Sequence, residues 1–200
     1  MLLVLDSSIG TSVAVVDLER GVIAERGEAD TMRHAEVVGA LIRDVLAEAD
    51  VSIDELSGVV AGMGPGPFTG LRIGIAAARV FALGAGKPLV PMVSHDAIAA
   101  DWYEAGGTGE LLVVTDARRR ERYYSTYSDA DTRVQGPALA KPDDLPEAAN
   151  RVDATSVSAG ALGMVAERRY AAGLPFPADE PLYLRSPDVT LSAGPKRVTA

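Results

Sequence analysis

The sequence has no cysteine, one tryptophan and only two histidines among its 200 residues. The absence of cysteine excludes disulfide bonds, thiolate nucleophiles and cysteine-ligated zinc. No apolar run approaches the roughly 18 residues of a transmembrane helix, and no basic segment followed by an apolar one marks a leader. We therefore expect a cytoplasmic protein that does not enter a membrane.

Basic residues are in the minority, since 19 Lys and Arg stand against 28 Asp and Glu, giving a net charge of −9. Such a chain is not expected to grip a phosphate backbone alone, and a basic partner would suit it. The arginines gather in one place, Arg118, Arg119, Arg120 and Arg122. This cluster indicates either a solvated hairpin tip or a positive patch for a partner's carboxylates or for RNA phosphates.

The most informative stretch is glycine-rich and runs from 59 to 86. An apolar strand over 59–63 enters a rigid turn at 64–67, where Gly and Pro alternate. A helix is predicted to follow from Thr69 and to end near Gly86. One stripe of this helix has almost no side chains, because it consists of small residues at a spacing of four: Gly70, Gly74 and Ala78.

The helix predicted from Thr69 is apolar on nearly every side, since only Arg72 and Arg79 in it are charged. Two glycines inside a helix cost about 1 kcal/mol each relative to Ala, so we expect close approach of another backbone to offset that cost. Two alternatives stay open. Either the helix is buried wholly within its own domain, or one side packs on its own sheet and another docks a second protein.

The other apolar runs predict strands and helices in the order βββαβα, followed by a reduced repeat. The predicted strands of the first half cover 2–5, 12–16, 22–28, 56–63 and 89–93, and its helices 33–49, 69–84 and 94–103. The run Leu111–Asp116 echoes Leu2–Asp6, and 123–127 follows as a strand. Beyond it we expect a loop-rich middle around Pro137, Pro142 and Pro146, a helix over 161–172, and an extended tail.

This order predicts an α/β fold of two lobes with a cleft between them. We expect a first lobe over 1–97, a smaller lobe over 98–187 and a flexible tail over 188–200. Asp6 and Asp116 would end equivalent strands at the cleft, where they could hold a metal-bound nucleotide phosphate. Because their turns carry few glycines, capping of those turns is the other interpretation, and an ATP-dependent kinase or ATPase remains an alternative function.

Two further groups contain catalytic residue types. His34 begins a His-x-Glu sequence, but the position at i+4 is Val38, so we expect no metal site and interpret His34 as a partner-facing or capping residue. Ser94-His95-Asp96 cannot form a triad from sequence neighbours, and a helix N-cap at Ser94 or Asp96 is predicted instead. A peptidase is thus a second, less favoured alternative.

The segment Met63–Gly74 closely resembles the signature of the bacterial TsaB (YeaZ) family, whose usual form has Ser where this chain has Pro67. Four shorter motifs resemble others of that family in the correct order: Leu5-Asp6-Ser7-Ser8, Arg33-His34-Ala35-Glu36, Asp116-Ala117-Arg118-Arg119 and Leu182-Tyr183-Leu184-Arg185.

The resemblance implies an actin-like fold of the Hsp70 and sugar-kinase type. It implies a non-catalytic subunit that binds and activates TsaD, which transfers a threonylcarbamoyl group to the adenosine 3′ of the anticodon in tRNAs that read ANN codons. TsaE would join the complex, tRNA would be reached indirectly through it, and the chain alone would form a homodimer. No cofactor is implied, although ATP or ADP could bind at the interface with partners.

The resemblance also assigns two sets of residues, one to a nucleotide cleft and one to a partner interface. A degenerate nucleotide cleft is expected at Asp6, Ser7, Ser8, Gly64, Gly66, Asp116, Arg118 and Arg119. Because the family docks through its first two helices, the partner interface is expected at His34, Val38, Leu41, Ile42, Val45, Phe68, Thr69, Gly70, Leu71, Ile73, Gly74, Ala77 and Ala78. We expect Gly74→Leu or Ile75→Glu to abolish pairing while leaving the fold intact.

Overall fold

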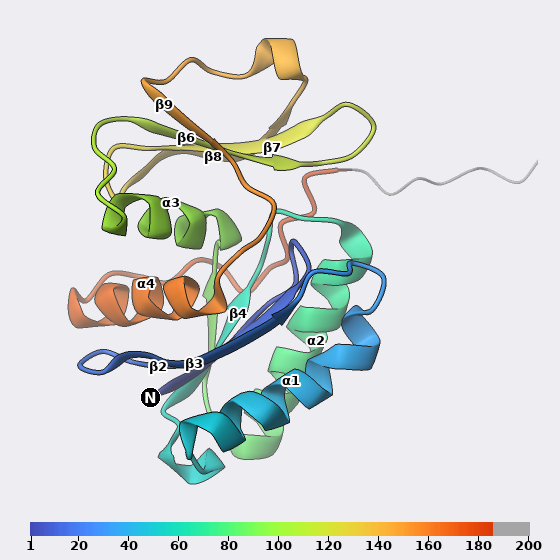
Figure 1. Ribbon diagram of the computed structural model, residues 1–200, viewed down its shortest axis with the longest axis vertical. Coiled ribbons are helices and arrows are strands. Elements are labelled where there is room, and N and C mark those ends of the chain that lie inside the picture. Colours follow the sequence, from blue (N-terminus) through green and yellow to red (C-terminus); the bar gives the residue numbers. More distant parts are fainter. Residues whose placement is uncertain (186–200) are drawn as a thin grey trace, which may run out of the picture.

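The computed structural model describes residues 1–185 and contains two β-sheets with helices packed on and between them (Figure 1). The first sheet has the strand order β3-β2-β1-β4-β5. Its strands are β1 (Leu2–Asp6), β2 (Thr11–Asp17), β3 (Gly21–Glu28), β4 (Gly58–Gly62) and β5 (Leu89–Met92). The first three form an antiparallel meander, and β4 and β5 continue the sheet parallel to β1.

The second sheet repeats the first four strands of this arrangement. Its order is β8-β7-β6-β9, with β6, β7 and β8 antiparallel and β9 parallel to β6. Its strands are β6 (Leu111–Asp116), β7 (Arg122–Tyr127), β8 (Arg133–Ala140) and β9 (Asn150–Asp153). Where the first half places a long helix before its fourth strand, the second has only the short 3₁₀ turn Pro142–Asp144. The predicted actin-like α/β fold with a reduced repeat is therefore confirmed.

Four α-helices belong to the described part of the chain, and they form two layers. The first pair, α1 (His34–Ala49) and α2 (Phe68–Ala85), covers one face of the first sheet. The second pair, α3 (Ser94–Glu104) and α4 (Ala159–Ala171), lies between the two sheets (Figure 1).

Both faces of β1 are buried, which explains its unbroken apolar sequence. Leu3 and Leu5 pack with α1 and α2, whereas Val4 packs with Leu162 of α4 in the core between the sheets. A Cβ at Gly163 would lie 2.6 Å from a methyl carbon of Val4, so α4 approaches the first sheet closely. The helix from the second half thus packs against the sheet of the first, across the expected lobe boundary at 97 and 98.

The expectation of a loop-rich middle holds at Pro142 and Pro146, which lie in a 3₁₀ turn and a loop, but it is wrong at Pro137, which lies in β8, and it missed β9. Pro137 is accommodated because β8 is an edge strand and its register against β7 shifts at this point. Edge strands and bulges are the places where a sheet tolerates proline, which cannot donate to the ladder. The four residues of β9 carry too little apolar pattern to predict a strand.

The helix cap predicted at Ser94 or Asp96 is also wrong. The N-cap of α3 is Val93, and no side chain caps this helix. Ser94 and Asp96 instead bond to other parts of the fold.

The last described segment, 172–185, runs from α4 past α2 toward the β6–β7 hairpin, as Leu182 N donates to Met63 O at 2.8 Å and Arg185 Nη1 to Ala117 O at 3.1 Å. The expected flexible tail over 188–200 lies outside the described residues.

Candidate functional site

Asp6 ends β1 as a buried carboxylate whose oxygens are occupied by neighbouring groups. Its Oδ1 accepts hydrogen bonds from Ser8 N at 2.8 Å and Ser8 Oγ at 2.6 Å, and its Oδ2 accepts one from Ser94 Oγ at 2.5 Å. Burial raises the pKa of Asp6, and the hydrogen bonds from Ser8 and Ser94 oppose that rise. A Cβ at Gly62 would overlap Oδ2, so β4 also closes over the carboxylate. Asp6 is 2% exposed and thus links three parts of the fold.

Asp116 ends β6 at the position that corresponds to Asp6, but its environment is different. It is exposed and pairs with Arg122 at 2.5 Å. In the turn that follows, Arg118, Arg119 and Arg120 all have positive φ, of 63°, 49° and 64°. Three consecutive non-glycine residues rarely adopt this left-handed region. Arg122 belongs to the ion pair, so the positive patch consists of these three exposed arginines at a hairpin tip.

A cavity of about 580 Å³ lies between the Gly-Pro turn, the start of α1 and the β6–β7 hairpin, and we call it the hairpin cavity. From the predicted nucleotide cleft it includes Ser8, Gly66 and Arg118. From the predicted interface it includes His34, Phe68, Thr69, Gly70 and Ile73. The other predicted cleft residues do not line it: Asp6, Ser7, Gly64, Asp116 and Arg119. The two aspartates required by the kinase alternative therefore do not meet in this cavity.

His34 is expected from the sequence to face a partner or to cap a helix, but its side chain points into the fold and is 5% exposed. Its Nδ1 lies 2.8 Å from Thr11 Oγ1, and burial lowers the pKa of the imidazole. A Cβ at Gly70 would lie 2.9 Å from Nε2, so glycine is needed for α2 to begin here. The imidazole thus fastens the first turn of α1 to β2 and to the start of α2.

The other histidine, His95, is completely buried between α3 and the second sheet. Its Nδ1 lies 2.9 Å from Ser125 Oγ and its Nε2 lies 3.0 Å from Thr115 Oγ1. Burial lowers the pKa of His95 to about 3. The neighbouring Ser94 and Asp96 bond elsewhere, to Asp6 and to Tyr127 and Arg133, so these three residues form no triad. Within 1–185, no three His, Asp or Glu side chains lie close enough to hold a metal ion.

The small-residue stripe of α2 faces its own β1–β2 turn. Ser7 Oγ donates a hydrogen bond to Gly70 O at 2.8 Å, and a Cβ at Gly74 would overlap Ser7 Oγ. The predicted close backbone approach is therefore confirmed, and the neighbour is this chain itself. Ile75 is 3% exposed, so the expectation that Gly74→Leu or Ile75→Glu leaves the fold intact is wrong.

The residues predicted for the partner interface divide by their exposure. Those buried within the chain are His34, Val38, Val45, Gly70, Leu71, Gly74 and Ala78. Those half-buried are Leu41, Ile42, Ile73 and Ala77. Phe68 and Thr69 are exposed. A docking surface for a protein partner would therefore have to use the second group and exposed neighbours such as Val80, whereas Phe68 and Thr69 border the hairpin cavity.

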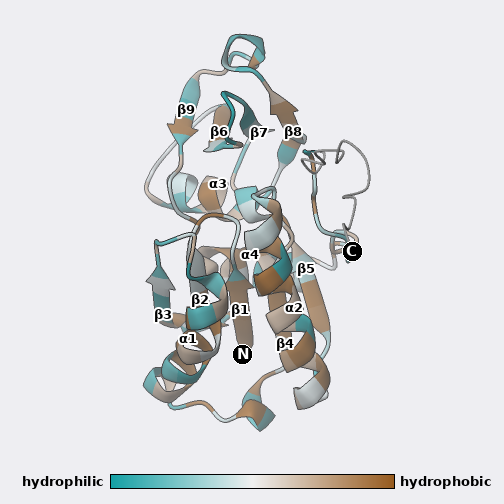
Figure 2. Ribbon diagram, turned by 90° about the vertical axis from the view of Figure 1, so that its right-hand side faces the viewer, coloured by the Kyte–Doolittle hydropathy of each residue, from teal (hydrophilic) through white to brown (hydrophobic). Residues whose placement is uncertain are grey.

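The opposite side of α2 is open to solvent, and we call it the open face of α2; it carries apolar residues together with the two arginines of the helix, Arg72 and Arg79. Val80 is 70% exposed and Leu83 is 84% exposed, at the helical spacing that also exposes Ala76. Figure 2 shows the hydrophobic colouring along this helix. Within the described part of the chain, α2 alone is long and apolar enough to cross a membrane, a test that a core helix also passes. Its stripe packed on Ser7 and the sheet is that of a core helix, so one side packs within the chain and the other lies open.

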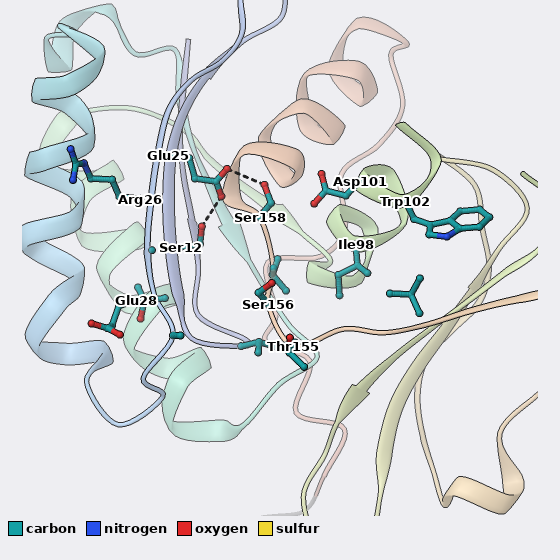
Figure 3. Close-up of a pocket in the computed structure, with 16 residues that line it drawn as sticks. Ser12, Glu25, Arg26, Glu28, Ile98, Asp101, Trp102, Thr155, Ser156 and Ser158 are labelled. Atoms are coloured by element: carbon teal, nitrogen blue, oxygen red, sulfur yellow. Dashed lines mark hydrogen bonds between the residues drawn. The ribbon is translucent and has the colours of Figure 1, made fainter. Parts of the chain in front are cut away.

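A second cavity, of about 620 Å³, lies between β2, β3, α3 and the start of α4 (Figure 3). Glu25 accepts hydrogen bonds from Ser12 Oγ at 2.8 Å and Ser158 Oγ at 3.0 Å. Burial, followed by the charges of Glu25 and Glu104, raises the pKa of Asp101 to about 6. Sequence reasoning missed this group, because its members come from four separate segments and belong to no motif.

The chain is similar to a protein family, to individual proteins and to solved structures. A protein-family model described as TsaD, tRNA N6-adenosine threonylcarbamoyltransferase, matches residues 11–174. An uncharacterized protein of Mycobacterium leprae is 37% identical over 161 residues, which cover 80% of this chain and 40% of that protein. An uncharacterized protein of Mycobacterium tuberculosis is 37% identical over 181 residues, which cover 84% of this chain and 82% of that protein.

The Escherichia coli tRNA threonylcarbamoyladenosine biosynthesis protein TsaB is 28% identical over 131 residues, covering 64% of this chain and 57% of that protein. The chain therefore spans less than two thirds of the M. leprae and E. coli relatives. Among solved structures, a Pseudomonas aeruginosa protein described as similar to peptidase YeaZ superposes with a TM-score of 0.81 at 23% identity, over 92% of this chain and 99% of that one. This likeness shows a shared fold.

Proposed function

This chain belongs to the TsaD-like protein family, in its TsaB (YeaZ) group, and from that premise we propose that it is a non-catalytic partner subunit. It binds a TsaD protein and activates the transfer of a threonylcarbamoyl group to the adenosine 3′ of the anticodon in tRNAs that read ANN codons. TsaE joins this complex, and two copies of the chain pair when TsaD is absent. The observation that carries the proposal is the open face of α2.

The physical argument is that an exposed apolar helix face is unfavourable in water. Fully burying a side chain such as Val or Leu contributes about 1.5–3 kcal/mol, so covering Val80 and Leu83 would stabilise a complex substantially. The half-buried Leu41 and Ile73 lie on the two helices that pack together, α1 and α2, and would extend the contact.

The absence of catalysis is proposed from the occupation of each candidate group. The carboxylate of Asp6 is closed by Ser8 and Ser94, and that of Asp116 is held by Arg122. A kinase would need both carboxylates to face a bound phosphate, and a peptidase would need a nucleophile with its base. We accordingly propose a cytoplasmic subunit without a resident metal or nucleotide.

The test is co-purification of this chain with the TsaD of the same organism, followed by threonylcarbamoylation of a tRNA that reads ANN codons. We expect Val80→Glu and Leu83→Glu to abolish both co-purification and stimulation, because each places a charge on the open face. Val134→Glu is the matched control, since Val134 is 67% exposed on the distant strand β8. Stimulation that survives Leu83→Glu, or ATP turnover by the purified chain alone, would refute the proposal.

A further inference from the structure

The hairpin cavity differs in charge from the rest of this acidic chain. Among the described residues that line it there is no carboxylate, and its charged members are Arg118 and Arg185, of which Arg185 pairs with Glu121 outside the lining at 3.5 Å. The other cavities each contain at least one carboxylate, such as Glu25, Asp96 and Glu167. Because Asp and Glu outnumber Lys and Arg by 28 to 19 in the chain, this local reversal favours an anionic ligand.

Two aromatic rings stand at the edge of the same cavity. The ring centroids of Phe68 and Tyr183 are 4.7 Å apart, and both side chains belong to residues that are 38% exposed. The guanidinium of Arg72 lies 3.9 Å from the centroid of the Phe68 ring. Tyr183 follows Leu182, whose amide donates to Met63 O, so the backbone that carries this ring is attached to the turn before α2. The two rings are tilted by 50° to each other, so they form an apolar corner beside the positive groups, and Arg72 already covers part of Phe68.

The start of α2 adds a third feature. The helix has 18 residues, its N-cap is Pro67 without a side-chain cap, and its first turn contains no acidic residue. Helix N-termini attract anions through their backbone N–H groups and the helix dipole. The cavity is lined by the first residues of α2 and its cap, Pro67, Phe68 and Thr69, so the positive end of this helix faces the cavity together with Arg118. The buried imidazole of His34 lines it as well.

The backbone at the tip of the β6–β7 hairpin is strained in a manner that fits a binding role. Arg118, Arg119 and Arg120 all have positive φ, which is unfavourable for residues that carry a Cβ. The surrounding hairpin maintains this conformation, with Ala117 N donating to Glu121 O at 3.1 Å. Such strain gathers at binding sites because it places side chains where a relaxed turn would not.

We propose that the hairpin cavity binds one unpaired nucleotide of an RNA strand directly. The base lies against Phe68 and Tyr183, and its phosphate is held by Arg118 and the N-terminus of α2. The proposal rests on the proposed function, in which tRNA is the substrate of the complex, and adds a contact made by this chain itself. An acidic protein segment would use the arginines but not the rings. Single-stranded RNA uses both, since its bases stack on aromatic side chains.

The test measures fluorescence anisotropy of a labelled single-stranded RNA heptamer with the full chain. Arg118→Gly removes the guanidinium and suits the positive φ, and Tyr183→Leu removes the ring while keeping apolar bulk. We expect each variant to weaken binding about tenfold, and Arg118→Gly to lower the slope against salt by about 1. Arg20→Gly, in an exposed turn, and Tyr170→Leu, 74% exposed on α4, are matched controls that should leave binding unchanged.

Three results would overturn the proposal. The first is that the heptamer does not bind, or binds equally to all four variants. The second is that free AMP competes as well as unlabelled heptamer, which indicates a mononucleotide site. The third is that hexaglutamate competes equally, which indicates a protein partner. Leu83→Glu separates the two proposals, since it should lose pairing with TsaD and keep RNA binding, whereas Arg118→Gly should do the reverse.

Discussion

Ser94 Oγ donates a 2.5 Å hydrogen bond to Oδ2 of Asp6, and this contact joins the start of α3 to the end of β1. The same hydroxyl accepts a hydrogen bond from Gly64 N at 3.1 Å, which fixes the turn that leads into α2. Asp6 therefore lies at the junction of three segments distant in sequence. Its carboxylate is a structural connector whose position happens to match that of a phosphate-binding residue.

Removing this carboxylate should destabilise the fold. Asp6→Ala leaves the donors at Ser8 and Ser94 without a buried acceptor, and we expect it to lower the free energy of unfolding by about 3 kcal/mol. Asp6→Asn keeps one acceptor and removes a buried charge, so it should lose less than half as much. Urea denaturation of both variants measures the difference. A fully stable Asp6→Asn variant that had lost an ATPase activity of the wild type would contradict this structural role.

The strands and helices of the first half could be predicted because their apolar residues repeat with clear periods and their ends carry Gly or Pro. The failures have a common physical cause, which is that they depend on partners distant in sequence. The sequence around Ser94 predicts a helix cap, but Asp6 lies 88 positions away and binds its hydroxyl. The edge strand β8 is defined by its pairing with β7, so Pro137 in its own sequence indicates a loop.

The candidate site could be predicted only in part, for the same reason. The motif at 63–74 identifies the family and the importance of α2. It cannot show which side of an almost uniformly apolar helix is buried, because Ser7 determines this by packing against Gly70 and Gly74. The exposed Val80 and Leu83 belong to no motif, and their significance appears only once the opposite side is seen to be covered.

Glycine at position 74 should be needed for stability, whatever the partner. A Cβ there would overlap Ser7 Oγ, so we expect Gly74→Ala to lower the free energy of unfolding by about 1–3 kcal/mol. At Gly84 in the same helix an added Cβ would meet no other segment within 4 Å, so Gly84→Ala should raise stability by up to about 1 kcal/mol. Thermal denaturation compares the two variants. Equal effects of both would mean that helix propensity, not the contact with Ser7, governs position 74.

Acid should destabilise the protein partly through His95. Because its pKa is about 3 in the fold and 6.5 in the unfolded chain, the unfolded state binds an extra proton between these values. Stability should therefore fall as pH decreases through this window, by about 3 kcal/mol between pH 6.5 and 4. His95→Asn should be less stable at pH 7 but lack this dependence. Urea denaturation at several pH values checks the difference, and parallel curves for the two proteins would contradict it.

Asp101 should change the stability of the fold with pH in the opposite direction. Burial and the charges of Glu25 and Glu104 raise its pKa to about 6, so the folded protein keeps a proton that the unfolded chain has lost between about pH 4 and 6. Stability should fall as pH rises through this window, because Asp101 must then ionise near Glu25, which Ser12 and Ser158 hold in place (Figure 3).

Asp101→Asn should therefore match the wild type near pH 4 and exceed it at pH 7. We expect a gain of about 1 kcal/mol, since Asp101 is partly exposed and solvent screens its interactions. Asp143→Asn, in an exposed 3₁₀ turn, is the matched control and should change nothing. High salt should shrink the gain by weakening the repulsion from Glu25 and Glu104. Because protonated Asp and Asn have nearly the same shape, the substitution should change packing little, and a gain that is equal at pH 4 and pH 7 would contradict the electrostatic explanation.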